Sequence, residues 1–298
     1  MEFVLDFKPD HGQPVQLENG IRRITAKNPS AFTFQGTNSY IIGTETLAVI
    51  DPGPADEAHL TSLLKTIDDR PVSHIFVSHT HADHSTLAPM LARKTGAVMV
   101  AIGPHKAARA LHEGEVNRLE ASADTNFTPD VIVEHHDLIE GDGWALQTVF
   151  TPGHCANHAA FALVGTGVLF SADHVMAWAT SIVAPPDGSM TDYMDSLDRL
   201  LEREDRIYYP GHGGPVLRPK PFVRAMKTHR RMRESAIVER LKKGDRLISD
   251  MVKAIYRDTD PRLHGAAALS VFAHLEDLVE RGIVSCEGVP ALDAVYSA

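Results

Sequence analysis

The sequence predicts an α/β layered fold followed by a smaller, mainly helical module. Short apolar runs recur over about the first 210 residues, and helix-like segments lie between them, which predicts the layers. The module is predicted by a change of pattern, because helical periodicity dominates from Phe222 onward. With 298 residues, of which 43% are apolar, the chain can form one large domain and one small one.

Strand-like runs and helical segments alternate in the first part of the chain, and turn signals such as Asp51-Pro52-Gly53 separate them. The expected strands are 21–25, 40–43, 47–51, 73–78, 97–101, 144–150, 159–164 and 167–171, with a short one at Ile207. The expected helices are 55–67, 85–94, 104–111 and 191–202. This alternation indicates two sheets covered by helices.

The second part is expected to begin at a chain break, Pro219-Lys220-Pro221. We therefore place one domain at 1–219 and another at 220–298. Helices are expected at 222–242, 247–256 and 265–281, and the segments 282–286 and 291–297 are expected to pair as a hairpin. Three helices and a terminal wing indicate a winged-helix-like module.

The charge of the chain is unevenly distributed. Residues 1–219 carry 15 Lys and Arg against 28 Asp and Glu, whereas residues 220–298 carry 14 against 11. Within 220–246 the balance is 10 against 3. The first part should therefore repel polyanions, and the basic helix 222–242 could attract them.

The sequence also predicts a cytoplasmic protein that does not contact a membrane. Its N-terminus has no basic segment followed by an apolar one, and no run approaches the roughly 18 apolar residues of a membrane span. The two cysteines, Cys155 and Cys286, lie far apart and do not suggest a disulfide framework.

The motif His79-Thr80-His81-Ala82-Asp83-His84-Ser85 carries most of the chemical information. It offers three imidazoles and a carboxylate within six positions, directly after an apolar strand. Such donors suit zinc, iron or manganese. Three more candidates, His154, Asp173 and His212, each follow a later predicted strand. Strand ends gather functional loops in layered folds, so the sequence predicts one metal site.

These motifs resemble those of the metallo-β-lactamase superfamily. The H-x-H-x-D-H element and the three later ligands occur in the order of that family, and the resemblance covers roughly residues 17–219. It implies an αββα sandwich. The C-terminal module resembles the winged-helix extension of the lactamase-beta-2-like branch, some members of which cleave RNA.

The resemblance implies two Zn²⁺ ions about 3.5–4 Å apart, with Fe or Mn as alternatives. The implied ligands are His79, His81 and His154 for one ion, Asp83, His84 and His212 for the other, and Asp173 as the bridge. A hydroxide bridging the metals would be the nucleophile. Asp83 and Asp173 are the candidate catalytic residues, and Asp83 is preferred for acid/base duty.

Several further residues are candidates for supporting or substrate-binding roles. Asp51 could orient a ligand histidine from behind, or it could simply end its strand; the first interpretation is preferred. His158 could approach the metals, but a structural hydrogen-bonding role is preferred. His174 should point away from the site. Cys155 could ligate metal, although a small buried side chain is the simpler interpretation.

Four more candidates lie nearer the C-terminus. Tyr193 could line a substrate pocket or pack in the core. On the basic helix, His229, Arg230 and Arg233 are expected on or near the apolar stripe that faces the first domain. They could bind an anionic substrate group or pair with acidic residues across the interface, and pairing is preferred because the first domain is acidic.

The function predicted from these features is hydrolysis of a small-molecule ester, thioester or lactone by a dinuclear metal site. The leading alternative is an endoribonuclease or phosphodiesterase acting on single-stranded RNA. An iron-dependent sulfur dioxygenase and a DNA-binding regulator are the remaining alternatives. Duplex DNA binding is disfavoured because the expected recognition helix, 265–281, has no Lys or Arg before Arg281. That helix could instead serve domain packing or a homodimer contact.

Overall fold

A computed structural model describes residues 2–117 and 120–298. Its first sheet has seven strands arranged in chain order, antiparallel from β1 to β4 and parallel from β4 to β7. The strands are β1 (Val15–Glu18), β2 (Ile21–Thr25), β3 (Asn38–Ile42), β4 (Leu47–Ile50), β5 (Val72–Phe76), β6 (Val98–Ala101) and β7 (Val131–Ile132).

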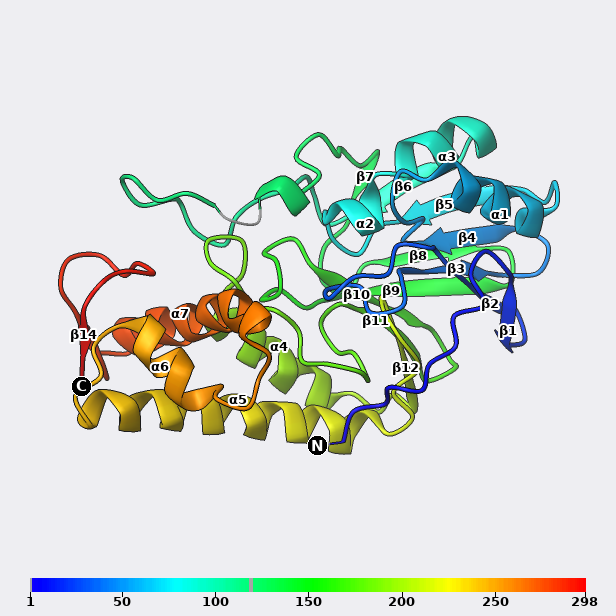
Figure 1. The fold of residues 1–298 in the computed structure, drawn as a ribbon. Coiled ribbons are helices and arrows are strands. Elements are labelled where there is room, and N and C mark those ends of the chain that lie inside the picture. Colours follow the sequence, from blue (N-terminus) through cyan, green and yellow to red (C-terminus); the bar gives the residue numbers. More distant parts are fainter. Residues whose placement is uncertain (1, 118–119) are drawn as a thin grey trace.

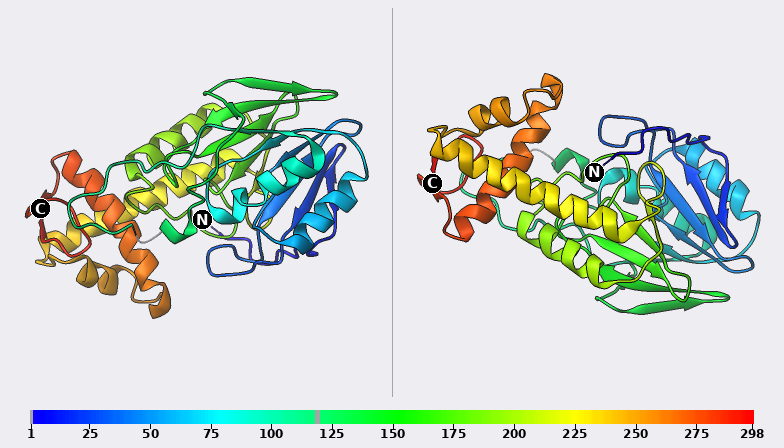
Figure 2. Two further views of the ribbon diagram at one scale, coloured as in Figure 1. Left: turned by 90° about the horizontal axis from the view of Figure 1, so that it is seen from above. Right: turned by 90° about the horizontal axis from the view of Figure 1, so that it is seen from below.

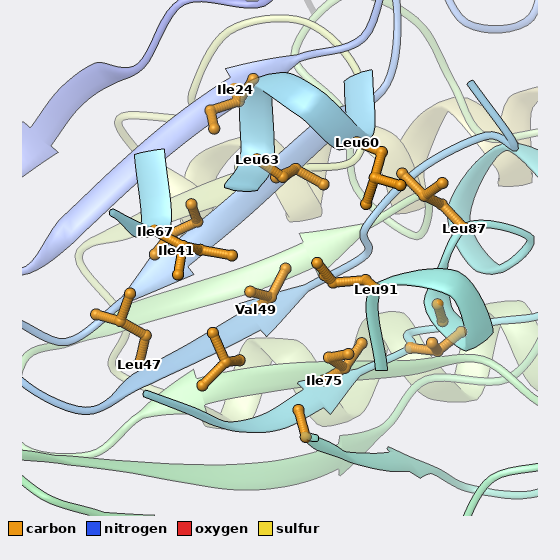
Figure 3. Packing of buried hydrophobic residues seen from close by; sticks show 14 of the residues in the cluster. Ile24, Ile41, Leu47, Val49, Leu60, Leu63, Ile67, Ile75, Leu87 and Leu91 are labelled. Atoms are coloured by element: carbon orange, nitrogen blue, oxygen red, sulfur yellow. The ribbon is translucent and has the colours of Figure 1, made fainter. Parts of the chain in front are cut away.

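The helices α1 (Glu57–Ile67) and α3 (Ala88–Thr95) cover the outer face of this sheet. Leu63 of α1 and Leu91 of α3 pack on Val49 and Ile75 of the central strands, as Figure 3 shows. Asp56 caps α1 by accepting a hydrogen bond from the backbone N–H of His59. Burial of these aliphatic side chains fixes the helices on the sheet.

The second sheet has five strands in the order β12-β11-β10-β9-β8, and only the β11–β12 pair is parallel. Its strands are β8 (Leu138–Gly141), β9 (Trp144–Phe150), β10 (Ala159–Leu163), β11 (Val168–Ala172) and β12 (Ile207–Pro210). The helices α4 (Met190–Glu202) and α5 (Pro219–Lys242) pack on its outer face through one buried cluster.

The inner faces of the two sheets pack against each other (Figure 1). Tyr40, Phe76, Phe161 and Phe170 form part of this shared core. The layers therefore run helix, sheet, sheet, helix, which confirms the predicted αββα fold.

The C-terminal part is mainly helical and lies at one end of the sandwich (Figure 2). It contains the second half of α5, α6 (Ile248–Ile255), α7 (His264–Glu280) and a two-stranded hairpin of β13 (Ser285–Cys286) and β14 (Tyr296–Ser297). The helix α5 belongs to two cores, since Val223 packs with the sandwich and Ile237 packs with α6 and α7. The boundary at 219/220 stays a prediction.

The structure differs from the expected elements in three places. Residues 104–111 form no helix; Arg109 instead ties this loop to Glu115 and Glu276. The expected helix 85–94 is two helices, α2 (Ala82–Ser85) and α3. Pro219 does not interrupt the chain but begins α5, where a proline needs no backbone N–H.

Five short elements of the described residues escaped the sequence analysis: the strands β1, β7 and β8 and the 3₁₀ turns η1 (Glu120–Ser122) and η2 (Pro261–Leu263). Within the described residues, no helix is both long and apolar enough to cross a membrane.

Candidate metal centre

The seven predicted ligands come together at one end of the two sheets, each from a segment that follows a strand. They are His79 and His81 after β5, Asp83 and His84 in α2, His154 after β9, Asp173 after β11 and His212 after β12. Ala172, in a left-handed conformation with φ 43°, turns the chain sharply just before Asp173. Strand ends therefore place side chains that are far apart in sequence around one point.

Three imidazoles form the first group. His81 Nδ1 lies 3.1 Å from His79 Nε2 and 3.0 Å from His154 Nε2. These three nitrogens converge and, with Cys155 Sγ nearby, belong to a group that could hold one ion.

The second group combines two imidazoles with a carboxylate. His84 Nε2 and His212 Nε2 are 3.3 Å apart, and Asp83 Oδ2 lies 3.5 and 3.3 Å from them. Asp173 touches both groups, because its Oδ2 is 3.2 Å from His212 Nε2 and 3.8 Å from His154 Nε2. Asp173 thus occupies the position that the bridging role requires.

The outward nitrogen of every imidazole already has a partner. The partners are Ser78 Oγ for His79 (2.9 Å), Asp51 Oδ2 for His84 (2.9 Å), the Ile182 carbonyl for His154 (2.6 Å), the Gly36 carbonyl for His212 (3.2 Å) and Cys155 Sγ for His81 (3.7 Å). A nitrogen that donates outward leaves a lone pair on the inward nitrogen of a neutral ring. Lone pairs that face each other at 3.0–3.3 Å repel unless a cation lies among them, so these residues fit metal ions.

The electrostatics of the cluster also favour cations. Burial lowers the pKa of His81 to about 3. Burial acts in the same direction on His212, but Asp173 and Asp83 overcome it and raise the pKa of that imidazole to about 9. Asp173 Oδ1 is buried without a hydrogen-bond partner. The carboxylates therefore favour positive charge in a site whose imidazoles are largely buried.

Asp51 supports both groups from behind. Its Oδ2 accepts hydrogen bonds from His84 Nδ1 (2.9 Å) and from the Ser78 hydroxyl (2.7 Å), and its Oδ1 accepts one from the Ser78 backbone N–H (2.7 Å). Since the Ser78 hydroxyl donates to Asp51, it accepts from His79 Nδ1. Asp51 therefore lies within hydrogen-bond distance of His84 and of the Ser78 hydroxyl that contacts His79, and its orienting role stays a prediction.

Asp83 accepts a hydrogen bond from Thr37, a residue that the sequence analysis did not single out. The Thr37 hydroxyl donates to Asp83 Oδ2 at 3.0 Å. Asn28 Nδ2 donates to the same hydroxyl at 2.9 Å, and Asn28 Oδ1 accepts from the Thr37 backbone N–H. Because the hydroxyl accepts from Asn28, its single hydrogen is directed at Asp83. The available signal was a polar residue directly before the buried strand β3.

We expect Thr37→Val to lower the affinity for the ion held by Asp83 about 10–100-fold, the usual effect of losing an outer partner of a metal ligand. The substitution keeps the shape of the side chain but removes the hydroxyl that donates to Asp83. Thr37→Ser keeps the hydroxyl and should restore the affinity. Competition with a chromophoric chelator measures both. Equal affinity in Thr37→Val and the wild type would contradict this role.

A cavity of about 290 Å³ opens onto the cluster. It is lined by Ser30, Phe32, Thr33, His81, Ala82, Asp83, Ser122, His154, Asp173, Ile182 and His212. Among the residues that the structure describes, no Lys or Arg lines this cavity. Phe32, Ala82 and Ile182 provide its apolar wall, so it suits a small substrate with an uncharged apolar part.

Two candidate residues near the ligands lie outside this cavity. His158 is buried beneath His79, with ring centroids 5.0 Å apart, and its Nδ1 lies 2.8 Å from Thr151 Oγ1. Tyr193 is fully buried and donates its hydroxyl to the His174 carbonyl at 3.0 Å. Both side chains therefore pack behind the site, as does His174 itself, which is buried.

The basic candidates on α5 also lie outside the cavity. The expected pairing of Arg230 and Arg233 with acidic residues is not found: in the described part of the chain their contacts are with a carbonyl, a hydroxyl and aromatic rings. Arg230 donates to the Ser181 carbonyl and lies over the Tyr193 ring, and Arg233 lies over the Tyr256 ring at 4.6 Å. A carbonyl oxygen and aromatic rings, and not carboxylates, are therefore the partners of these two guanidinium groups. His229 is half-buried beside Arg230 and Arg233.

Cys155 borders the cluster from outside. Its Sγ faces the outward nitrogen of His81, and burial raises the pKa of the thiol. Because His81 presents its other nitrogen to His79 and His154, the sulfur is placed as a partner of the His81 ring.

Two family models match the chain. The metallo-beta-lactamase superfamily model matches residues 32–212, and the beta-lactamase associated winged helix domain model matches residues 248–289. The second match confirms the predicted winged-helix module.

Individual proteins give the same result. The Beta-lactamase-like protein 2 homolog of Drosophila melanogaster is 29% identical over 90% of this chain and 90% of its own length. The atrochrysone carboxyl ACP thioesterase AgnL7 of Paecilomyces divaricatus is 29% identical over 67% of this chain and 58% of its own length. The crystal structure of a beta-lactamase domain protein from Burkholderia ambifaria superposes with a TM-score of 0.81 at 20% identity, covering 98% of this chain and 95% of that one. The chain belongs to the metallo-beta-lactamase superfamily and carries the winged-helix domain associated with it.

Proposed function

We propose that the protein is a hydrolase for small-molecule thioesters, esters or lactones, and that its histidine and aspartate cluster holds two divalent ions, with zinc preferred. His79, His81 and His154 would hold one ion, Asp83, His84 and His212 the other, and Asp173 both. Bound there, such ions would lower the pKa of water and polarise a carbonyl oxygen.

Asp83 is the residue best placed to move a proton. It lines the cavity and its side chain is 27% exposed, whereas the Asp173 side chain is only 8% exposed. The Thr37 hydroxyl holds Oδ2 of this carboxylate in place. Asp83 could therefore accept a proton from attacking water and deliver it to the leaving group.

The residues that line the cavity favour an acyl substrate over a phosphodiester. The apolar wall of Phe32, Ala82 and Ile182 suits an acyl group. A phosphodiester would bring negative charge next to Asp83, and none of the described lining residues is a Lys or Arg that could offset it. The relatives named acyl carrier protein thioesterases support the same choice.

An activity panel on metal-quantified protein tests this proposal. The panel contains thioesters, esters, lactones, phosphodiesters and single-stranded RNA, with oxygen uptake on a thiol substrate as a further arm. We expect about two zinc equivalents and acyl-substrate hydrolysis that Asp83→Ala abolishes. Asp142→Ala, a matched change at an exposed turn, should leave the rate unchanged. Faster RNA cleavage would favour the endoribonuclease, and iron with oxygen uptake would favour the dioxygenase.

We expect Phe32→Ala to raise KM for a long-chain acyl substrate with little change in kcat. Phe32 is 55% exposed at the cavity wall, and its loop is held by stacking of Phe34 on Trp178. Partial burial of this ring by a substrate is worth about 1 kcal/mol, or about fivefold in kcat/KM. An acetyl substrate should be unaffected.

The matched control for Phe32→Ala is Leu138→Ala, which truncates a half-exposed side chain on the edge strand β8. It should change neither substrate. If Phe32→Ala slows the acetyl and long-chain substrates equally, the ring acts on the site itself and does not bind the acyl group.

A further inference from the structure

The loop between β11 and α4, residues 173–189, has neither helix nor strand, yet it carries two parts of the metal centre. Asp173 begins it, and the Ile182 carbonyl accepts the hydrogen bond from His154 Nδ1 at 2.6 Å. Ile182 also lines the cavity. Because no strand ladder fixes this backbone, side chains must hold its carbonyl groups in place.

Ser181 and Tyr193 hold the loop from within the sandwich. The Ser181 hydroxyl lies within hydrogen-bond distance of the backbone oxygens of Asp173 and His174, the second at 2.9 Å. The Tyr193 hydroxyl of α4 donates to the same His174 oxygen at 3.0 Å. The ends of the loop are thus drawn together behind the metal ligands.

Arg230 of α5 closes this network. It donates through Nη2 to the Ser181 carbonyl and through Nη1 to Ser270 Oγ of α7 at 3.2 Å. Its guanidinium lies over the Tyr193 ring, 5.0 Å from the centroid. The residue is 4% exposed, and it is therefore a buried cation whose neighbours are a carbonyl, a hydroxyl and an aromatic face.

The position of Arg230 in α5 makes this contact a link between the two parts of the chain. α4 and α5 lie side by side, and α7 packs against both (Figure 2). Arg230 therefore joins the C-terminal helix α7 to the loop that presents Ile182 and Asp173. A forked guanidinium can hold two acceptors at once, which a lysine ammonium on a flexible stem does less well.

We propose that Arg230 is a positioning residue through which the C-terminal part of the chain holds the 173–189 loop in the geometry that the metal centre needs. Without it, the Ser181 carbonyl loses its donor, and the neighbouring Ile182 carbonyl no longer fixes the His154 ring. The metal affinity then depends on a side chain that touches neither metal ligand nor substrate. The inference rests on the metal site of the proposed function.

The test compares Arg230→Met with Arg233→Met in the full-length protein. Both changes remove a guanidinium from α5 and keep an unbranched stem, but Arg233 lies over Tyr256 within the C-terminal core and does not touch the loop. We expect Arg230→Met to lower zinc affinity about tenfold, by analogy with the loss of outer partners of ligands. Its Co²⁺-loaded form should show a changed visible absorption spectrum. Arg233→Met should show the wild-type affinity and spectrum.

A packing role alone would give a different result. Arg230→Met would then melt at a lower temperature but bind Zn²⁺ and Co²⁺ as the wild type does, and the proposal would be overturned. If Arg230→Met does not fold, Arg230→Lys keeps the charge and is measured instead. We expect faster amide hydrogen exchange in residues 173–189 of Arg230→Lys and a smaller loss of zinc affinity; unchanged exchange and affinity would overturn the proposal.

The same experiment separates this inference from the proposed function. A wild-type protein that binds neither Zn²⁺ nor Co²⁺ would refute the metal site itself. A wild-type protein that binds both ions, together with an Arg230→Met variant that binds them equally well, would refute only the role of Arg230.

Discussion

Removing the metal ions should abolish hydrolysis and lower the melting temperature by on the order of 10 °C or more. Ligand binding to the folded state alone contributes about 4 kcal/mol per site when the free ligand is about 1,000 times Kd, and about 2–4 °C of melting temperature accompanies each kcal/mol in a chain of this size. Without ions, the inward nitrogens of His79, His81 and His154 face each other at 3.0–3.1 Å. Asp173 Oδ1 would also remain buried without a partner.

Scanning calorimetry and hydrolysis assays before and after chelation measure this effect. Incubation with the calcium complex of the same chelator is the control for direct chelator binding and should change nothing. Adding two equivalents of Zn²⁺ should restore both the melting temperature and the rate. A chelated protein with less than about a tenth of an ion per chain that still melted and reacted as before would contradict the metal centre.

The candidate ligands could be proposed from the sequence because each lies within a few residues after an apolar run that is recognisable as a strand. The H-x-H-x-D-H element needs only the few residues of α2 to bring His79, His81 and His84 together, so its local sequence already contains most of its geometry. His154 follows β9 and Asp173 follows β11, and both strands run antiparallel to β10 between them, so their ends lie at the same edge of the second sheet.

The groups that form hydrogen bonds with the candidate ligands were harder to predict from the sequence. His154 and His212 bond to the carbonyls of Ile182 and Gly36, and every residue type carries a carbonyl. Thr37 reaches Asp83 across 46 positions, a contact that only the tertiary fold creates. Side chains that act through the backbone of a distant loop, as Arg230 does, leave no local signature at all.

At residues 104–111 the sequence predicts a helix that the structure does not contain. Ala107, Ala108 and Ala110 favour a helix, and Pro104 suits a helix start, so the sequence reads as helical. In the structure Arg109 instead forms ion pairs with Glu115 at 2.6 Å and with Glu276 of α7 at 2.5 Å. Tertiary contacts with the C-terminal part thus override local propensity.

Gly211→Ala should disrupt the metal centre without altering any ligand. A Cβ at this position would lie 2.3 Å from Asp173 Oδ1 and 2.7 Å from His84 Cε1, far inside van der Waals contact. The backbone cannot retreat, because the Gly211 N–H donates to the Ala172 carbonyl at 2.9 Å and its carbonyl accepts from the Asn38 N–H at 2.7 Å. The side chains of Asp173 and His84 must therefore move.

We expect Gly211→Ala to lose about 1–3 kcal/mol of stability from overpacking and to bind fewer than two ions per chain. Hydrolysis should fall about 100-fold or more, since small misplacements of catalytic groups have effects of that size. Gly265→Ala is the matched control, because a Cβ there meets nothing within 4 Å. That variant should keep the wild-type metal content and rate. Gly211 contributes no side chain to the centre, so the only effect of the substitution is the Cβ that displaces Asp173 and His84. A Gly211→Ala protein with two ions and full activity would show that Asp173 and His84 do not share one metal site.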